Sequence, residues 1–143
     1  MGYDHDPEYP TAHSDTYVKA TGKYSTAYEP FFATDPAISL TGTRVDSTWL
    51  EDATTEQRAH IDLGSARIVK RIYLENYHDE GAHTDRGVNN FTFWGSNEAS
   101  AFAELTYATD DDWTQLTCNR ASWNEHPATD TEDPQYALVS NST

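Results

Sequence analysis

The sequence predicts an all-β domain, an antiparallel β-sandwich, and three observations support this prediction. Several short segments alternate apolar and polar residues with a period of two, as half-buried strands do. Turn-forming residues separate these segments, and none of the six prolines lies within a long helical pattern. Aromatic residues make up 13% of the 143 residues, so a few large side chains can fill a thin core.

The alternation is clearest in residues 58–64, with the sequence RAHIDLG. The apolar residues fall on one face and His60 and Asp62 on the other, which predicts a half-buried strand with the apolar face inward. The side chain of Asp62 is expected to accept hydrogen bonds from the amides of the turn that follows. Gly64 supplies the backbone freedom that such a turn requires.

Further strands are predicted in segments rich in β-branched and aromatic residues. In RIVKRIYLENY, residues 67–77, Ile72 and Leu74 share one face and Arg71 and Tyr73 share the other. The remaining strand candidates are NNFTFWGSN (89–97), TQLTC (114–118) and QYALVSN (135–141). One short helix of one or two turns is predicted in EASAFAEL (98–105), after an asparagine that favours helix N-caps.

The chain is predicted to form one domain, residues 15–143, preceded by an extended lead-in, residues 1–14. The lead-in contains two prolines and no Lys or Arg. Cys118 is the only cysteine, which excludes an internal disulfide. No apolar run approaches the ~18 residues of a membrane span, and the acidic start lacks the features of a secretory signal.

The charge balance is strongly acidic, with 24 Asp and Glu against 9 Lys and Arg and a net charge of −15 with His neutral. Such a surface repels phosphate backbones and anionic lipids, so neither nucleic acid nor a membrane is an expected partner. The expected location is extracellular or in a virion, because a virion component released by lysis needs no secretory signal. The alternative is a solvated acidic surface with no specific partner.

Three blocks of the sequence resemble the coagulation factor 5/8 type C, or discoidin, family. They are ATDPAISLTGTRVDSTWL (33–50), AHIDLGSARIVKRIYLENY (59–77), and NNFTFWGSN with DDWTQL (89–97 and 111–116). The middle block is the most specific, because it combines D-L-G with the spaced apolar residues of the family's hairpin. The resemblance covers about residues 18–118 and implies a galactose-binding-like jelly roll.

The C-terminus departs from the family pattern. The family closes its sandwich with a further strand pair, whereas this sequence has QYALVSNST where that pair would begin. A sandwich without a central strand would leave backbone groups unpaired beside its core. Three alternatives follow: the chain is a fragment that lacks the closing strands, a partner subunit supplies a strand, or QYALVSN itself takes that role.

Two long loops, residues 77–88 and 119–134, are the predicted site of function, since long loops in compact domains are usually functional. Sugars present hydroxyl pairs and apolar ring faces, which planar polar side chains and aromatic rings can bind. The predicted ligand-binding residues are Asn76, Tyr77, His78, His83, Asp85, Arg86 and Asn90, with Trp123 and His126 in second rank. The alternatives are a solvated loop ordered by an Arg86–Asp85 pair, and a Trp123 that covers the core.

The family resemblance also implies a structural Ca²⁺ ion held by Asp35, Asp46 and Thr48, since Ca²⁺ prefers oxygen ligands. The alternative is that both aspartates only cap turns. No catalytic motif is recognised: the two histidines of HDEGAH lie five residues apart, unlike the i, i+4 pair of a helical zinc motif, and G-x-S-x-G does not occur. The chain is therefore predicted not to be an enzyme.

Together these observations predict a non-catalytic carbohydrate-binding or adhesion module of a phage tail, a virion appendage or a secreted surface protein. Its expected partner is a cell-surface glycan or a polysaccharide. One alternative is a structural subunit of an extracellular or virion assembly that contacts a copy of itself or a neighbouring subunit through its C-terminal edge. Another is an accessory binding module of a glycoside hydrolase.

Overall fold

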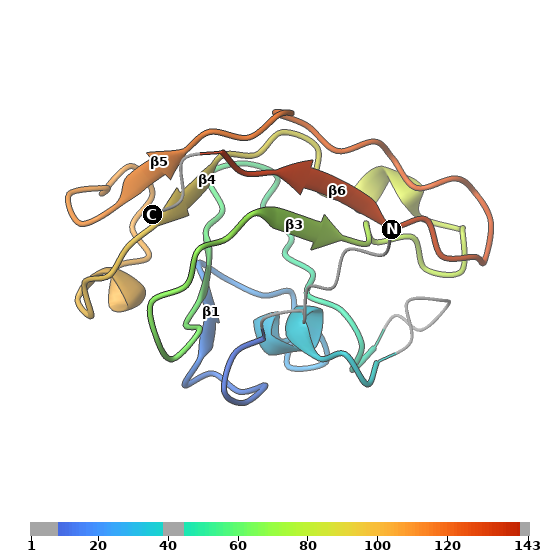
Figure 1. Cartoon of the computed structure of the whole chain (residues 1–143). Helices are drawn as coiled ribbons and strands as arrows, with labels where there is room; N and C mark the ends of the chain where they lie inside the picture. Colours follow the sequence, from blue (N-terminus) through green and yellow to red (C-terminus); the bar gives the residue numbers. More distant parts are fainter. Residues whose placement is uncertain (1–8, 39–44, 141–143) are drawn as a thin grey trace.

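The computed structural model describes residues 9–38 and 45–140, and within them the chain forms short strands and 3₁₀ turns joined by long loops (Figure 1). In chain order the elements are β1 (Val18–Ala20), η1 (Pro30–Thr34), β2 (Ala59–Ile61), β3 (Arg71–Leu74), η2 (Thr84–Arg86), β4 (Phe93–Gly95), η3 (Ala101–Ala103), β5 (Thr114–Leu116) and β6 (Gln135–Leu138). No helix in these described ranges has the length and apolar character needed to cross a bilayer.

The strands form three antiparallel pairs, β1 with β2, β3 with β6, and β4 with β5. This arrangement confirms an all-β fold with antiparallel sheets, and no barrel forms in the part of the chain that the structure describes. Strands β2 to β6 each lie within a predicted strand segment, whereas β1 was not predicted. The predicted helix over 98–105 is reduced to the single 3₁₀ turn η3. Because each described sheet has two strands, the jelly-roll sandwich stays a prediction.

The C-terminal strand β6 pairs within the chain on both of its sides. Along one side it pairs with β3, with Tyr136 opposite Tyr73, and Figure 1 shows the two strands next to each other. On the other side Val139 bridges Cys118, and the amide of Ser140 donates a hydrogen bond of 3.0 Å to the Thr117 carbonyl. QYALVS therefore has backbone partners on both flanks, and the three alternatives for the closing strands of a sandwich stay predictions.

The predicted orientation of β2 is wrong. His60 is 4% exposed and Ile61 is 50% exposed, so the polar face is the buried one. The imidazole of His60 lies 3.1 Å from the Phe102 carbonyl oxygen and packs against the Trp113 ring, at 4.6 Å between centroids. Alternation shows which residues share a face of a strand, but neighbouring elements decide which face is covered.

The turn after β2 follows the prediction. The Gly64 amide donates a 2.7 Å hydrogen bond to Oδ1 of Asp62. The φ angle of Gly64 is +75°, a left-handed conformation that favours glycine.

The structure buries both apolar and polar side chains, and the two kinds lie in different parts of the molecule. The buried apolar side chains are few and come from several elements: Val18, Ala101, Trp123, Ala137 and Val139. The buried polar ones are His60, Asn76, His78, Asp79, His126 and Gln135. Most of these polar residues lie in or beside the two long loops. Buried polar groups require partners, so the loops are expected to contain a dense network of contacts.

Candidate functional site

Asn76 joins the first loop (77–88) to the second loop (119–134). Its side-chain amide donates hydrogen bonds to the carbonyl oxygens of Val88, at 2.9 Å, and Asn124, at 3.0 Å. Its Oδ1 accepts a 2.6 Å hydrogen bond from the Val88 amide. A buried amide with three backbone partners fixes the ends of the first loop against the second.

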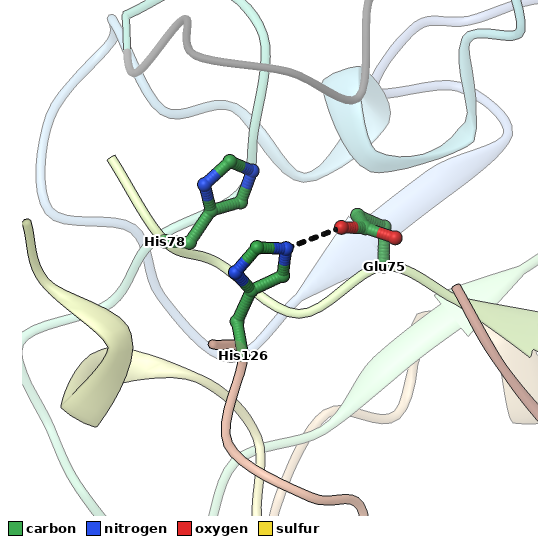
Figure 2. A group of neighbouring side chains, drawn as sticks. All are labelled: Glu75, His78 and His126. Carbon is green, nitrogen blue, oxygen red and sulfur yellow. Dashed lines mark ion pairs between the residues drawn. The ribbon is translucent and has the colours of Figure 1, made fainter. Parts of the chain in front are cut away.

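Three ligand-type side chains converge where the loops meet: Glu75, His78 and His126 (Figure 2). Glu75 directly follows β3, His78 lies in the first loop and His126 in the second. Their candidate ligand atoms all lie within 4.8 Å of one another. The two imidazole rings are stacked, with centroids 3.8 Å apart and planes 10° from parallel. Oε1 of Glu75 lies 2.9 Å from Nε2 of His126.

Backbone groups hold two of these side chains in place. Nδ1 of His126 lies 2.6 Å from the Pro127 carbonyl oxygen. A carbonyl oxygen only accepts, so Nδ1 bears the proton and the lone pair of a neutral ring is on Nε2. The Glu75 carboxylate accepts hydrogen bonds from the Asp133 amide, at 2.9 and 3.2 Å. The side chains of Glu75 and His126 are 7% and 0% exposed, so this contact is shielded from water.

Nε2 of His126 is close to a carboxylate and yet makes no hydrogen bond. It is buried without a hydrogen-bond partner, although Oε1 of Glu75 is at ion-pair distance. With the proton of the neutral ring on Nδ1, Nε2 has no hydrogen to donate to that carboxylate. The remaining histidine, His78, accepts a 3.2 Å hydrogen bond at Nδ1 from the Gly81 amide.

A pocket of about 310 Å³ is walled by residues of both loops, and its wall residues Asn76 and Glu125 are the sequence neighbours of Glu75 and His126. Its walls combine carboxylate, amide and hydroxyl side chains with one indole ring: Asn76, Thr84, Asp85, Gly87, Val88, Asn89, Trp123 and Glu125. The structure thus brings together three of the predicted ligand-binding residues, Asn76, Asp85 and Trp123, in one pocket wall. Glu75, His78 and His126 form the adjacent cluster.

Trp123 combines the two roles that the sequence left open. It lines the pocket, and it is also buried, with its ring stacked on Phe91 at 4.6 Å between centroids and 12° between planes. The guanidinium carbon of Arg120 lies 4.7 Å from the Trp123 ring centroid. The indole therefore covers part of the core and forms the apolar part of the pocket wall.

The other predicted ligand residues lie around the pocket. Tyr77 is half-buried, and Nε2 of His83 lies 3.5 Å from Oδ2 of Asp79. Arg86 is exposed on η2, and among the described residues no ion pair joins it to Asp85. Asn90 is exposed and forms an antiparallel bridge with Ser122. None of these four predicted residues is part of the pocket wall.

The predicted calcium ligands lie elsewhere in the chain. Oδ1 of Asp35 accepts a 2.9 Å hydrogen bond from the Ala37 amide, as the turn-capping interpretation predicts. Asp46 is exposed, with a φ angle of +56°, and Thr48 is half-buried. Residues 39–44, which belong to the same predicted loop, lie outside the described residues. A calcium ion at Asp35, Asp46 and Thr48 stays a prediction.

Sequence reasoning did not single out Glu75 or Glu125. Glu75 was placed in a strand pattern, although the spacing Glu75-x-x-His78 at a strand end could have identified it as a ligand pair. Glu125, which lines the pocket, lies in the predicted second loop next to His126. The convergence of the two loops depends on tertiary packing, for which the sequence carries no local signal.

Comparisons of the chain with protein-family models, with curated proteins and with solved structures found no match. The resemblance to the discoidin family therefore rests on the sequence blocks themselves.

Proposed function

We propose that the chain is a non-catalytic carbohydrate-binding module that holds a glycan between its first and second loops. The observation that carries this proposal is the pocket of about 310 Å³, whose walls come from both loops. Small-ligand sites are concave and combine apolar or aromatic surface with convergent polar groups, and here the polar groups predominate beside one indole ring. The discoidin-like sequence blocks support the same function.

The chemistry of the pocket wall suits sugar hydroxyls. The carboxylates of Asp85 and Glu125 accept hydrogen bonds, and the amide of Asn89 both donates and accepts them. The indole of Trp123 offers an apolar surface for a sugar ring. Two carboxylates in the wall favour a neutral sugar or an amino sugar over a uronic or sulfated one, since like charges repel.

The pocket is small, near the lower end of the roughly 300–1,000 Å³ typical of small-ligand sites. It therefore suits a terminal sugar residue better than a long polysaccharide segment. A single site of this kind binds weakly, so tight attachment to a cell surface would require several copies. Such multivalency fits a phage tail, a virion appendage or a secreted adhesin, and also an accessory module of a glycoside hydrolase.

The proposal is tested by probing a glycan array with the full chain, with and without Ca²⁺. Asp85→Ala removes a carboxylate from the pocket wall, whereas Arg86→Ala changes its exposed neighbour outside that wall. Loss of binding with Asp85→Ala locates the glycan in the pocket, and loss with Arg86→Ala alone locates it on the outer face of the loop. Asp111→Ala, which removes an exposed carboxylate outside the pocket wall, is the matched control.

Three results would contradict the proposal: no glycan bound by the wild-type chain, unchanged binding in both loop variants, or loss of binding with Arg86→Ala alone. The arm with Ca²⁺ tests the calcium prediction separately. If a structural Ca²⁺ ion at Asp35, Asp46 and Thr48 supports the fold, its removal weakens glycan binding in the wild-type chain and the Asp111→Ala variant alike.

A second candidate function, a structural subunit of an assembly, is favoured by the exposed face of the β3–β6 sheet. Tyr73, Tyr136 and Leu138 are 45%, 44% and 55% exposed on that face. The two tyrosine rings meet edge to face at 5.3 Å between centroids, and Arg71 lies over Tyr136. Sedimentation velocity separates the candidates: a concentration-dependent oligomer that Tyr136→Ser disperses supports the subunit, and a monomer at all concentrations contradicts self-assembly.

A further inference from the structure

We propose that Glu75, His78 and His126 bind one divalent transition-metal ion of the zinc class. Two imidazoles and one carboxylate are a ligand set that zinc uses, with the fourth position left to water or a small ligand. The candidate ligand atoms lie within 4.8 Å of one another. Metal–ligand bonds of about 2.0–2.1 Å place tetrahedral ligands about 3.4 Å apart. Glu75 and His126, now 2.9 Å apart, would therefore open slightly on binding, while the more distant ligand atoms would move closer.

The unpaired Nε2 of His126 is the strongest single reason for a metal at this place. The atom is buried and has no hydrogen-bond partner, in a side chain that is 0% exposed. Leaving a polar atom unpaired in the interior is unfavourable. A metal ion on the lone pair of Nε2 would satisfy this atom and at the same time neutralise the buried carboxylate of Glu75.

The backbone contacts around the cluster match those that orient metal ligands in proteins. The Pro127 carbonyl, 2.6 Å from Nδ1 of His126, selects the tautomer in which Nε2 can bind a metal. The Asp133 amide holds the Glu75 carboxylate at 2.9 Å. These contacts position two of the three ligands before an ion arrives, which lowers the entropic cost of binding.

His78 is the ligand that must rearrange. Its Nδ1 accepts a 3.2 Å hydrogen bond from the Gly81 amide, so in the neutral ring the proton is on Nε2. If His78 binds through Nε2, the proton moves to Nδ1 and the Gly81 contact is released. If it binds through Nδ1, the metal replaces the amide as partner of that atom. Either route exchanges one hydrogen bond for a coordinate bond.

Ligand chemistry excludes calcium as the ion of choice here. Calcium requires six to eight oxygen ligands, whereas imidazole nitrogen suits zinc and its transition-metal neighbours. The ion would tie Glu75 and the first loop to the second loop. Asn76 and Glu125, which line the pocket, are sequence neighbours of Glu75 and His126. A metal therefore stabilises the pocket walls whatever ligand the pocket holds, and this inference stands apart from the proposed function.

The test uses the full chain without a polyhistidine tag, dialysed against EDTA and titrated with zinc chloride by isothermal calorimetry. We expect one equivalent of zinc per chain, and a rise in melting temperature of roughly 10 °C at one hundred times the Kd. Glu75→Gln keeps the size of the side chain and its acceptor for the Asp133 amide. It should weaken zinc binding at least ~100-fold, as should His78→Ala and His126→Ala.

The matched control is His83→Ala, which removes a histidine of the same loop that lies outside the cluster. This variant should bind zinc as the wild-type chain does, and cobalt should give the visible absorption of a four-coordinate site in both proteins. The proposal is overturned if the wild-type chain binds no stoichiometric zinc, or if Glu75→Gln binds it unchanged. Loss of zinc in His83→Ala would also overturn it. Glycan binding by the metal-free protein is scored separately, so failure of one proposal does not imply failure of the other.

Discussion

His60 and His126 are both almost completely buried, with 4% and 2% of their surface exposed, but their surroundings differ. His60 lies on β2 against the Trp113 ring, with the Phe102 carbonyl 3.1 Å from Nδ1. Arg58 and Lys19 are the cations near it. His126 lies in a loop, stacked on a second imidazole and 2.9 Å from a carboxylate.

This comparison shows that two equally buried histidines can have very different surroundings. The neighbours of His60 are aromatic rings, a backbone carbonyl and the cations Arg58 and Lys19, which would repel a metal ion, with Glu104 as the acidic group near it. The neighbours of His126 are two further ligand-type side chains whose candidate atoms all converge. A binding site is indicated by several ligand-type side chains that converge on one point, and not by the burial of a single residue.

Among the changes that test this comparison, we expect Trp123→Ala to have the largest effect on the free energy of unfolding. The region around His126 contains few buried apolar side chains, and Trp123, stacked on Phe91, is the largest of them in the described residues. Its removal should lower the free energy of unfolding by about 3–5 kcal/mol. The measurement is urea denaturation of the metal-free protein.

Trp94→Ala is the matched control, because Trp94 is only half-buried and its indole donates to the neighbouring Thr92 hydroxyl. It should cost clearly less than Trp123→Ala. A loss below ~1 kcal/mol for Trp123→Ala would show that the polar network around His126 and Asn76 holds the loops without an aromatic anchor. Equal losses in the two variants would show that the deeper burial of Trp123 does not set its effect.

The strands were predictable because their pattern is local. The alternation in 67–77 and 135–141 identifies β3 and β6, and the exposed positions of Arg71 and Tyr73 agree with it. β1 has three residues, as β2, β4 and β5 do, but its surrounding sequence was not identified as a strand segment. The inverted face of β2 could not be predicted, since it depends on where η3 and Trp113 pack, far along the chain.

The candidate site was also predictable only in part. Loop length and polar composition identified both loops, and they include Asp85 and Trp123 of the pocket wall. The contact between Glu75 and His126 could not be predicted from the sequence, because it forms only when the two loops pack together. Asn76 was predicted to bind a ligand, yet its amide bonds to backbone atoms of both loops. A polar side chain in a loop has the same composition signal whether it binds a ligand or the backbone.

A smaller effect, the pH dependence of stability caused by His60, also tests the comparison of the two buried histidines. Burial is the main cause that lowers the pKa of His60 below 6.5, and Arg58 and Lys19 lower it further. The Phe102 carbonyl and Glu104 oppose this shift. The folded protein therefore keeps this ring neutral at pH values where the unfolded chain protonates it.

The sign of the pH dependence follows from this shift. Above pH 6.5 the ring is neutral in both states and its contribution to stability is complete. As the pH falls below 6.5, the unfolded chain binds a proton that the folded chain does not, so stability is lost until the folded pKa is reached. Urea denaturation at a series of pH values measures how the free energy of unfolding changes with pH. EDTA in the buffer keeps the proposed metal site empty.

His60→Gln is the variant that isolates this effect, because glutamine retains a polar side chain of similar length but does not titrate. Its stability should fall less steeply than that of the wild-type chain below pH 6.5, while His83→Ala should keep the wild-type slope. Parallel curves for the wild-type and His60→Gln proteins would mean that the pKa of His60 is the same in the folded and the unfolded chain. In that case His60 would carry a positive charge among its aromatic neighbours at low pH. Only the carboxylate of Glu75 would then distinguish the surroundings of His126 from those of His60.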